Sequence, residues 1–572
     1  MPQIKRIFYL LNKKEKLNFF ILICLMVVNS FFEVLGITSI IPIISITINS
    51  DMSFFEGMFF YDFLNDFSQS RDFVLLSFLF VATIFVLKNS FIIFYSYFLS
   101  KFHCETAERF SNDIYSYYLN IDYKNYLNLS TSKLIYDTTE AVEIFRITLL
   151  NACNFLLEIT VLLIITLFLI YLNPTSTIAV LMVLGILSVF FYIFFVKQNF
   201  YWGSEVKKNS TNRINVLNTS YSSIKDVKIY SGENFFYKKF KTLNNFVNKY
   251  QKTHLFFISL PKPFFEALII IILLTTLYYF IKIENAGYDM IILNLAVFAV
   301  SLFRIYPSIY RIAVCFQKGN YGKAVLNELN QLFHKKKLNI DLMTNKKKFN
   351  FDKIISLNLK NLNFRYENKE KQILKNLNLE LKTNQFIGIR GETGAGKSTL
   401  VDIITGLLKP ESGSFTINEK KFSSLPKNWH NNISYVPQNI SLIDDTLERN
   451  IALGINDKHI DRNKIMEVIK LSKLNKFSQS SYIDSVLGEN GLQVSGGEKQ
   501  RIGIARALYY DRKIFIFDEA TNALDENTEV GILENLRENL KDKIVIFISH
   551  KSTTLKFCDK IFNFSKGELK QI

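Results

Sequence analysis

Cysteine is scarce and scattered in this chain of 572 residues. An odd number of cysteines without a C-x-x-C pair argues against a disulfide framework and against a cysteine-bound zinc site. We therefore expect reduced or buried thiols at all five positions, which are Cys24, Cys104, Cys153, Cys315 and Cys558.

Two further features are missing from a chain whose formal net charge is +17. It has no arginine-rich recognition helix and no basic strands with interleaved aromatics, so the charge does not indicate nucleic-acid binding. The lysines instead crowd segments beside long apolar runs, which favours an anionic membrane surface as the partner. The basic N-terminus also lacks a small-residue cleavage site after its apolar stretch, so we expect this stretch to stay in the protein.

Long apolar stretches are what the sequence has in abundance, with 49% hydrophobic residues and 54 phenylalanines. One bilayer crossing needs about 20 apolar residues. The N-terminus and residues 197–259 are rich in lysine, whereas residues 49–71 are acidic and aromatic, so both ends of the membrane region are expected in the cytoplasm. The expected spans lie near residues 17–48, 72–99, 149–172, 175–197, 262–282 and 288–316.

Two long polar connections, residues 100–148 and 198–260, are poor in proline and keep apolar residues at helical spacing. We expect each connection to leave the membrane as a helix, turn, and return as a second helix. The turns are expected near residues 121–132 and 222–239, where they would meet whatever domain lies below the membrane.

A lysine-rich linker over residues 335–350 separates the membrane domain (residues 1–334) from a different pattern. Short β-branched runs then alternate with helical ones, as in QFIGIR, KIFIFDE and KIVIFISH. This alternation indicates an α/β domain with a largely parallel sheet over residues 351–572. The predicted fold is therefore a six-helix membrane domain with long cytoplasmic extensions, fused to one α/β domain.

A glycine-rich segment follows the strand QFIGIR and precedes a helix, which is the context that a phosphate-binding P-loop requires. Its glycines let backbone N–H groups point at phosphate oxygens, and the N-terminus of the helix adds its positive dipole. The Lys397 ammonium would neutralise the β- and γ-phosphates, and the Ser398 hydroxyl would bind Mg²⁺. The residues predicted to bind ATP here are Gly391, Glu392, Thr393, Gly394, Ala395, Gly396, Lys397, Ser398 and Thr399.

The apolar strand KIFIFDE ends in two carboxylates, Asp518 and Glu519. A carboxylate at the C-terminal end of a parallel strand lies at the crevice where nucleotides bind. Asp518 suits a direct or indirect partner of Mg²⁺, and Glu519 is predicted to accept a proton from the attacking water. An apolar run ending in Asp-Glu is a weak signal by itself, but together with the P-loop it predicts nucleotide hydrolysis.

The segment Val494–Arg501 (VSGGEKQR) resembles the signature of the ABC transporter family, which most often reads L-S-G-G-Q. The resemblance extends along the whole α/β domain. It implies that Tyr366 stacks on adenine and that Gln438 is the Q-loop glutamine, a ligand of Mg²⁺. It also implies that Asp525 belongs to the D-loop and that His550 is the catalytic switch histidine.

The same resemblance implies a dimer. In this family the signature residues, here Ser495, Gly496, Gly497 and Glu498, complete the ATP site of a partner domain. Because the chain holds one P-loop and one signature, it needs a second chain, and a homodimer is the default expectation. Two residues depart from the usual pattern: Glu498 replaces a glutamine and Asn522 replaces a common serine, but neither change removes a group that the chemistry needs.

Three cations in the expected membrane spans are candidate substrate ligands, because charges within a bilayer are costly and usually functional or paired. Lys88 lies in the second span, and Arg304 and Arg311 lie in the sixth, flanking Pro307. Lining one cavity, they would suit an anionic phosphate or pyrophosphate head group. The residues leave two alternatives open: pairing with Glu158 and Glu266, or extension of Arg311 to the cytoplasmic surface.

The first three spans, the stretch FRIYPSIYRI and the aromatic external segment resemble bacterial flippases of lipid-linked oligosaccharides, those of the PglK type. This resemblance implies that the three cations handle a lipid pyrophosphate, although the family carries arginine where this chain has Lys88. It further implies an external amphipathic helix over Ser53–Phe67 that contacts a polyprenyl tail.

The predicted function is an ATP-driven flippase in the bacterial inner membrane, with its nucleotide-binding domain in the cytoplasm. Its substrate would be a polyprenyl-pyrophosphate-linked oligosaccharide, moved from the inner to the outer leaflet. The alternatives are an exporter of drugs, lipids or peptides and, from another class, an ATP-gated channel or a regulatory subunit. The presence of Glu519 and His550 disfavours an inactive subunit.

Overall fold

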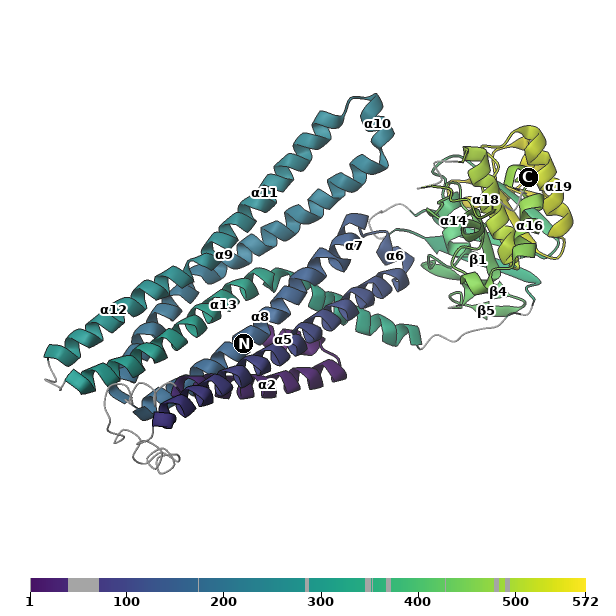
Figure 1. Ribbon diagram of the computed structural model, residues 1–572. Helices are drawn as coiled ribbons and strands as arrows, with labels where there is room; N and C mark the ends of the chain where they lie inside the picture. The colour runs from purple at the N-terminus through teal and green to yellow at the C-terminus, as the bar shows by residue number, and fades with distance from the viewer. Residues whose placement is uncertain are drawn as a thin grey trace. The chain divides into compact units, whose positions relative to one another are not determined.

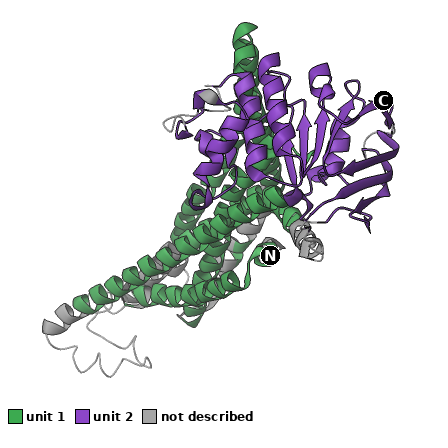
Figure 2. Cartoon of the chain, turned by 90° about the vertical axis from the view of Figure 1, so that its right-hand side faces the viewer, with its two compact units in different colours: residues 1–121, 126–340 green, residues 122–125, 341–572 purple. Residues whose placement is uncertain are grey.

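The computed structural model describes residues 2–39, 71–172, 174–282, 288–344, 351, 353–366, 372–426, 428–477, 483–488 and 494–572. The chain divides into two compact units (Figure 2). One comprises Met1–Ile121 and Tyr126–Ile340, and the other Asp122–Asn125 and Asp341–Ile572. The first unit is helical and the second is an α/β unit with two sheets, so the predicted architecture is confirmed.

Long helices dominate the N-terminal unit (Figure 1). All six predicted spans fall within them, apart from residues 40–48, which lie outside the described residues together with the predicted helix Ser53–Phe67. Within the described part, four segments are long and apolar enough to cross a membrane: Lys13–Gly36, Phe78–Asn120, Thr131–Phe168 and Glu233–Thr275. The span-bearing helices are α2 (Lys13–Thr38), α5 (Arg71–Asn120), α8 (Glu140–Leu172), α9 (Pro174–Ser222), α12 (Pro261–Lys282) and α13 (Tyr288–Thr344).

Helix α2 begins at a reciprocal cap that the sequence encodes locally. The Asn12 side chain accepts a hydrogen bond from the Glu15 backbone N–H (2.8 Å), and the Glu15 carboxylate accepts one from the Asn12 N–H (2.9 Å). This capping box satisfies two N–H groups that have no partner within the helix. The cap separates α2 from the short helix α1 (Pro2–Leu10), and Arg109 of α5 bonds to Glu15, which anchors the cap.

The two long connections turn where they are predicted to turn. Helix α5 ends at Asn120, and the chain returns through α6 (Tyr123–Tyr126) and α7 (Thr131–Thr138) into α8. Helix α9 ends at Ser222, and the chain returns through α10 (Ile224–Ile229) into α11 (Glu233–Ser259). Residues 122–125 of the first turn belong to the C-terminal unit, where Tyr123 packs against the hydrophobic core.

The second helical hairpin is held to α13 by a buried polar and aromatic contact. His254 of α11 is 6% exposed, and its Nδ1 lies 2.8 Å from Asn199 Oδ1 of α9. The His254 ring also stacks on Tyr321 of α13, with 3.9 Å between ring centroids. A buried polar group is costly without a partner, so this bond fixes which face of α11 meets α9. Helix α13 continues to Thr344, through part of the segment predicted as a linker.

The C-terminal unit contains a four-stranded antiparallel sheet in the order β2-β1-β4-β5. Its strands are β1 (Ser356–Phe364), β2 (Leu374–Lys382), β4 (Ser412–Ile417) and β5 (Lys420–Phe422). A second sheet has the order β10-β9-β3-β8-β7-β6 and is parallel except for its edge strand β10. Its strands are β3 (Gln385–Arg390), β6 (Ile433–Val436), β7 (Ile514–Asp518), β8 (Ile544–Ile548), β9 (Lys560–Ser565) and β10 (Glu568–Gln571).

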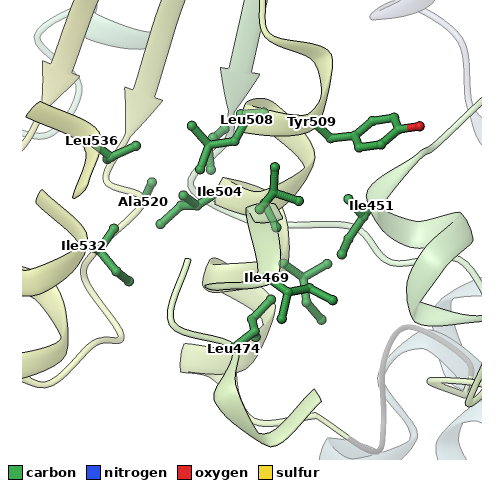
Figure 3. Close-up of a cluster of buried hydrophobic side chains, with 14 of the residues drawn as sticks. Ile451, Ile469, Leu474, Ile504, Leu508, Tyr509, Ala520, Ile532 and Leu536 are labelled. Atoms are coloured by element: carbon green, nitrogen blue, oxygen red, sulfur yellow. The ribbon is translucent and has the colours of Figure 1, made fainter. Parts of the chain in front are cut away.

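Helices cover the parallel sheet, and two apolar clusters fill the space between layers. Figure 3 shows Ile504 and Leu508 of α18 among side chains of α16 and α19, including Ile469 and Ile532. Each fully buried side chain of this size contributes about 1.5–3 kcal/mol relative to exposure. The helices of this unit are α14 (Lys397–Ile404), α15 (Leu447–Ile451), α16 (Arg462–Leu471), α18 (Gly496–Tyr510), α19 (Glu526–Asn539) and α20 (Ser552–Lys556), with short 3₁₀ turns at Trp429–Asn432, Asp457–His459 and Asn475–Phe477.

We predict that Gly203→Ala destabilises the N-terminal unit, because α9 and α13 approach each other closely at this glycine. An added Cβ would lie 2.1 Å from the Tyr321 carbonyl oxygen, so backbone must shift. Overpacking of this kind costs about 1–3 kcal/mol. Thermal unfolding of the detergent-purified protein should show a melting temperature several degrees lower. Gly232→Ala is the control, because its Cβ meets nothing closer than 3.6 Å; equal melting temperatures for the two variants would contradict the prediction.

Candidate nucleotide site

Four adjacent parallel strands place the predicted catalytic groups along one edge of the larger sheet. The order β3-β8-β7-β6 brings together the C-terminal ends of these strands. The P-loop follows β3, His550 follows β8, Glu519 follows β7, and Gln438 follows β6. Ligands of open α/β sheets bind at this edge. Segments far apart in the sequence therefore meet because the strands pair in this order.

The P-loop begins helix α14 with a glycine that no other residue replaces easily. Gly396, the N-cap of α14, has φ +114°, and a Cβ there would lie 2.8 Å from Ile373 Cγ2. Glycine adopts this backbone conformation without the penalty that a side chain would bring. Lys397, the first residue of the helix, donates from its ammonium to the carbonyls of Gly391 and Glu392. The loop and the helix N-terminus thus share one concave site for an anion.

Lys397 also connects the P-loop to the switch segment. Its Nζ lies 3.2 Å from His550 Nε2, and the same nitrogen of His550 lies 3.7 Å from Glu519 Oε1. The three predicted residues therefore form one continuous set of contacts. The lysine predicted to bind phosphate, the predicted switch histidine and the predicted base thus contact one another.

Glu519 has an unusual backbone and a held side chain. Its φ is +50°, a region that costs a non-glycine residue on the order of 1–3 kcal/mol and is concentrated at functional sites. Its N–H donates to the Ile548 carbonyl (2.9 Å), which fixes the turn after β7. On the side chain, Oε2 accepts from Gln438 Nε2 at 2.7 Å and from Asn522 Nδ2 at 2.9 Å. The carboxylate is therefore aimed by two amides.

Asp518 ends β7 in a buried, carboxylate-rich environment. It is 9% exposed, and the Tyr435 hydroxyl donates to its Oδ2 at 3.3 Å. Burial raises the pKa of Asp518, and the neighbouring Glu519 adds to this rise. The pKa of Asp402, in α14, is raised to about 6 by burial and by the negative charge of Asp518. Excess negative charge thus accumulates beside the P-loop.

The predicted adenine contact and signature occupy defined local positions. Tyr366 is half-buried, its ring meets Phe364 edge-on, and its hydroxyl lies 3.4 Å from Thr399 Oγ1. Ser495 is the N-cap of α18 and forms a capping box with Glu498, in which the Glu498 carboxylate accepts from the Ser495 N–H at 2.8 Å. A capping box uses glutamate or glutamine at this position, so the departure from glutamine at position 498 keeps the cap.

Two of the three predicted membrane cations, Lys88 and Arg311, are paired with carboxylates. Arg311 of α13 donates from Nη1 to Glu158 Oε1 of α8 at 2.8 Å. Pairing with Glu158 is one of the two alternatives that the sequence leaves open. Lys88 of α5 pairs with Glu33 of α2, also at 2.8 Å, rather than with Glu158 or Glu266. Of Arg304, the structure describes only the position within α13.

Sequence reasoning missed several residues of the nucleotide site. No role is predicted from the sequence for Tyr435 and Asp402, which face Asp518, or for Gln500, which bonds to the Glu519 carbonyl at 3.4 Å, although Gln500 lies within the signature segment VSGGEKQR. For Asn522, the sequence shows only a departure from the serine that is common in the family. Its one available signal was its place three residues after Glu519, which brings the two side chains together within a single turn.

Two family models match the chain. The model described as ABC transporter matches residues 374–522, and the model described as ABC transporter transmembrane region matches residues 20–303. The chain carries both domains of the ABC transporter family. The nucleotide site is accordingly that of an ATP-hydrolysing domain, and the chain is an ABC half-transporter with a helical membrane domain fused to an ABC nucleotide-binding domain.

Curated relatives agree with this domain pair. A protein of Rickettsia bellii, named as an export ATP-binding/permease protein, is 27% identical over 505 residues, which cover 86% of this chain and 85% of that protein. A similarly named Rickettsia typhi protein is 36% identical over 219 residues, and the match spans 38% of each chain. The leukotoxin translocation ATP-binding protein LktB of Mannheimia haemolytica is 36% identical over 216 residues, 37% of this chain and 30% of LktB.

One solved structure shares the fold over nearly the whole chain. It is a bacterial Atm1-family ABC exporter with ATP bound, which superposes with a TM-score of 0.79 and covers 98% of this chain and 95% of that one. The sequence identity is 17%. At this identity the similarity shows a common fold, and it carries no conclusion about the transported substrate.

We predict that Glu519→Gln abolishes ATP turnover while ATP binding is retained. An amide of the same shape keeps the side chain in place but cannot accept the proton of the attacking water. General-base removal typically costs about 10²–10⁴-fold in rate. Phosphate release and nucleotide binding by the purified protein would be measured together. Turnover within tenfold of the unaltered protein would show that another group acts as the base.

We predict a pH-dependent stabilisation by Asp402→Asn in protein free of nucleotide and magnesium. The pKa of Asp402 is about 6, above its ordinary 3.8. The stability that its protonated form contributes is present below pH 3.8 and is lost as the pH rises through 6. The neutral asparagine should therefore raise the melting temperature of the C-terminal unit at pH 7.5 and have little effect near pH 4. Asp542→Asn, at a 71% exposed side chain, should show no such pH dependence.

Proposed function

We propose that two copies of this chain form an ATP-driven flippase of a bacterial inner membrane. Its substrate would be a polyprenyl-pyrophosphate-linked oligosaccharide, which moves from the inner to the outer leaflet. The observation that carries the proposal is Arg311, a cation at the inner part of a membrane helix whose side chain is 55% exposed although it is paired with a buried Glu158. The likeness of the membrane spans to lipid-linked oligosaccharide flippases supports the choice of substrate.

In the proposed cycle, the nucleotide site works through residues of known position. The P-loop backbone and Lys397 hold the phosphates of ATP, and Tyr366 stacks on the adenine. The Glu519 carboxylate would accept the proton of the attacking water, and His550, which contacts both Lys397 and Glu519, would hydrogen-bond the terminal phosphate. Release of the product phosphate ends the interactions that keep the two domains of the dimer closed.

Magnesium fits this edge of the sheet. The Ser398 hydroxyl, the Asp518 carboxylate and the Gln438 amide oxygen are the hard oxygen donors that this ion prefers. Carboxylates of Asp402, Asp518 and Glu519 gather here, and the raised pKa values of the first two show their mutual repulsion and burial. When bound, the ion supplies positive charge that shields the phosphate oxygens. Asp518, Ser398 and Gln438 would hold it.

A homodimer would complete each site. Ser495 caps its own helix α18, and its hydroxyl and the following glycine backbone would meet the phosphates held by the partner's P-loop. Residues Ser495, Gly496, Gly497 and Glu498 begin this helix, whose positive N-terminus favours an anion. Two equivalent composite sites follow from two identical chains.

The membrane half suits an anionic head group because Arg311 keeps donors available. A guanidinium has five N–H donors in a planar fork that matches phosphate oxygens. Glu158 accepts from one nitrogen, Nη1, while more than half of the Arg311 side chain stays exposed. The 6% exposed Glu158 lowers the cost of placing this charge in the membrane. A pyrophosphate can then bind to the exposed part of the same guanidinium.

Lys88 and Arg304 complete the proposed set of cations, in unequal ways. The Lys88 side chain is 8% exposed and its ammonium is directed at Glu33, so a head group would have to displace that carboxylate to reach it. Arg304 lies seven residues before Arg311 in α13, which is close to two helical turns and places both on nearly one face of the helix. We therefore rank Arg311 as the primary ligand.

A second candidate function is a general exporter of drugs, lipids or peptides. The observation that favours it is the set of relatives, two named for export and one named for leukotoxin translocation. Such a protein would use the same motor, so the nucleotide site does not separate the two candidates. The substrate that stimulates ATP turnover does.

We predict that Arg311→Ala reduces flipping at least tenfold and leaves basal ATP turnover within about twofold. The substitution removes the exposed guanidinium but does not touch the nucleotide site. The measurement is translocation of purified polyprenyl-pyrophosphate oligosaccharide in proteoliposomes, scored together with ATP turnover. Arg146→Ala is the matched control, because Arg146 lies on the same helix as Glu158 but pairs with Glu143, just before the predicted span 149–172; its flipping should be unchanged.

Two outcomes would count against the proposal. Normal flipping by the Arg311 variant would remove that arginine from substrate handling. Stimulation of ATP turnover by apolar drugs or peptides, with no translocation of the lipid-linked glycan, would favour the general exporter.

A further inference from the structure

The Asn522 side chain contacts the carboxylate of the proposed base. Its Nδ2 donates to Glu519 Oε2 at 2.9 Å, the same oxygen that accepts from Gln438 at 2.7 Å. The other oxygen, Oε1, faces His550 at 3.7 Å. Both amides hold the same oxygen, and Oε1 is left directed toward His550.

The segment that carries Asn522 is held from one side by an ion pair whose carboxylate is buried. Lys551 donates to the backbone carbonyls of Thr521 (2.8 Å) and Leu524 (3.4 Å), and to Glu529 Oε2 at 2.9 Å. The Glu529 side chain is only 2% exposed. Asn522 thus lies between two residues whose carbonyls are bound by one ammonium.

Further bonds explain why Glu529 stays charged in this buried position. Its Oε1 accepts from the hydroxyls of Thr521 (2.9 Å) and Thr554 (2.6 Å). Burial alone would raise the pKa of Glu529, but these hydrogen bonds and Lys551 outweigh it, so the pKa lies below its ordinary value. A buried pair persists when its remaining donors and acceptors are satisfied in this way. The Lys551–Glu529 pair therefore holds the backbone on both sides of Asn522 in place.

The same segment is held from the other side by α18. Gln500 Oε1 accepts from the Ala523 N–H at 2.8 Å, and its Nε2 donates to the Glu519 carbonyl at 3.4 Å. Beneath these polar contacts, Ala520 is 2% exposed within the cluster that also holds Ile504 (Figure 3). The backbone on both sides of Asn522 is consequently fixed from two directions, although the Asn522 side chain itself is exposed.

We propose that Asn522 is a positioning residue for Glu519, and that the Lys551–Glu529 pair fixes the backbone that carries Asn522. The amide of Asn522 orients the carboxylate through Oε2, so that Oε1 receives the proton of the attacking water. This inference rests on Glu519 as the base of the proposed ATPase cycle and does not depend on the flippase substrate. It assigns a role to a position where the chain departs from the serine that is common in the family.

The chemistry explains why an amide suits this position. Gln438 has a second task, because its side chain is also a proposed ligand of magnesium, and a residue engaged by the ion is less available to hold Glu519. Asn522 has no competing contact of that kind among the proposed ligands. It therefore keeps Oε2 fixed whichever partner Gln438 takes. A serine hydroxyl is shorter by one heavy atom and reaches less far toward Oε2.

The first experiment separates positioning from folding. In the full-length protein, Asn522→Ala should lower the kcat for ATP about tenfold while the KM for ATP and the melting temperature stay nearly unchanged, because the side chain is exposed. Asn522→Ser should lie between the two. Asn539→Ala is the matched control, since the exposed Asn539 bonds only to the Asn535 carbonyl of its own helix in the described contacts. An unchanged kcat for Asn522→Ala overturns the proposal.

The second experiment tests whether Asn522 acts through Glu519. In a Glu519→Gln background, adding Asn522→Ala should leave the residual single-turnover rate unchanged, since the proton acceptor that Asn522 positions is already gone. A merely structural role would lower the rate by the same factor in both backgrounds, and that result overturns the proposal.

The third experiment tests whether the Lys551–Glu529 pair holds Asn522 in place. Lys551→Met should lower kcat by a factor similar to that of Asn522→Ala, and combining the two changes should add little. Lys551→Arg keeps the charge and should restore most of the rate. Lys543→Met is the control, because Lys543 pairs with Asp511 at 3.0 Å elsewhere on the same domain. Full additivity of Lys551→Met and Asn522→Ala would show that the ion pair does not hold Asn522 in place.

Discussion

The parallel pairing of four strands is the constraint on which the nucleotide site depends. Strands β3, β8, β7 and β6 lie in register so that Ile389, Ile548 and Asp518 are neighbours across the sheet. Each loop after these strands then begins at the same edge, and side chains separated by more than a hundred residues come within hydrogen-bond distance. The apolar clusters on the two faces of the sheet hold the strands in place. A few backbone hydrogen bonds then suffice to position the loops.

Much of this arrangement was predictable, because each motif carries its structural context with it. The P-loop between a strand and a helix, the acidic end of KIFIFDE and the two helical turns near residues 121–132 and 222–239 all lie where local pattern places them. What local pattern does not contain is the partner of a side chain. The pairing of Lys88 with Glu33 joins α2 and α5, and no spacing rule selects Glu33 over Glu158.

The same limit explains the missed residues of the site. Tyr435 reaches Asp518 because β6 pairs with β7, and Asp402 approaches Asp518 because α14 packs on a face of the same sheet. In the sequence, Lys551 is only the residue after the motif histidine. The folded structure shows that it pairs with the buried Glu529. Contacts of this kind depend on tertiary packing, and their residue types are common enough that sequence alone assigns them no role.

The grouping of residues 122–125 with the C-terminal unit has a consequence for how the chain matures. Tyr123 lies within the first half of the sequence, yet the core that it packs against is formed by residues beyond 350. Since a ribosome releases the N-terminal part first, Tyr123 is synthesised before the core residues against which it packs. The C-terminal unit therefore completes its core with an aromatic side chain from the first half of the sequence, so its folding depends on a segment that the ribosome has already released.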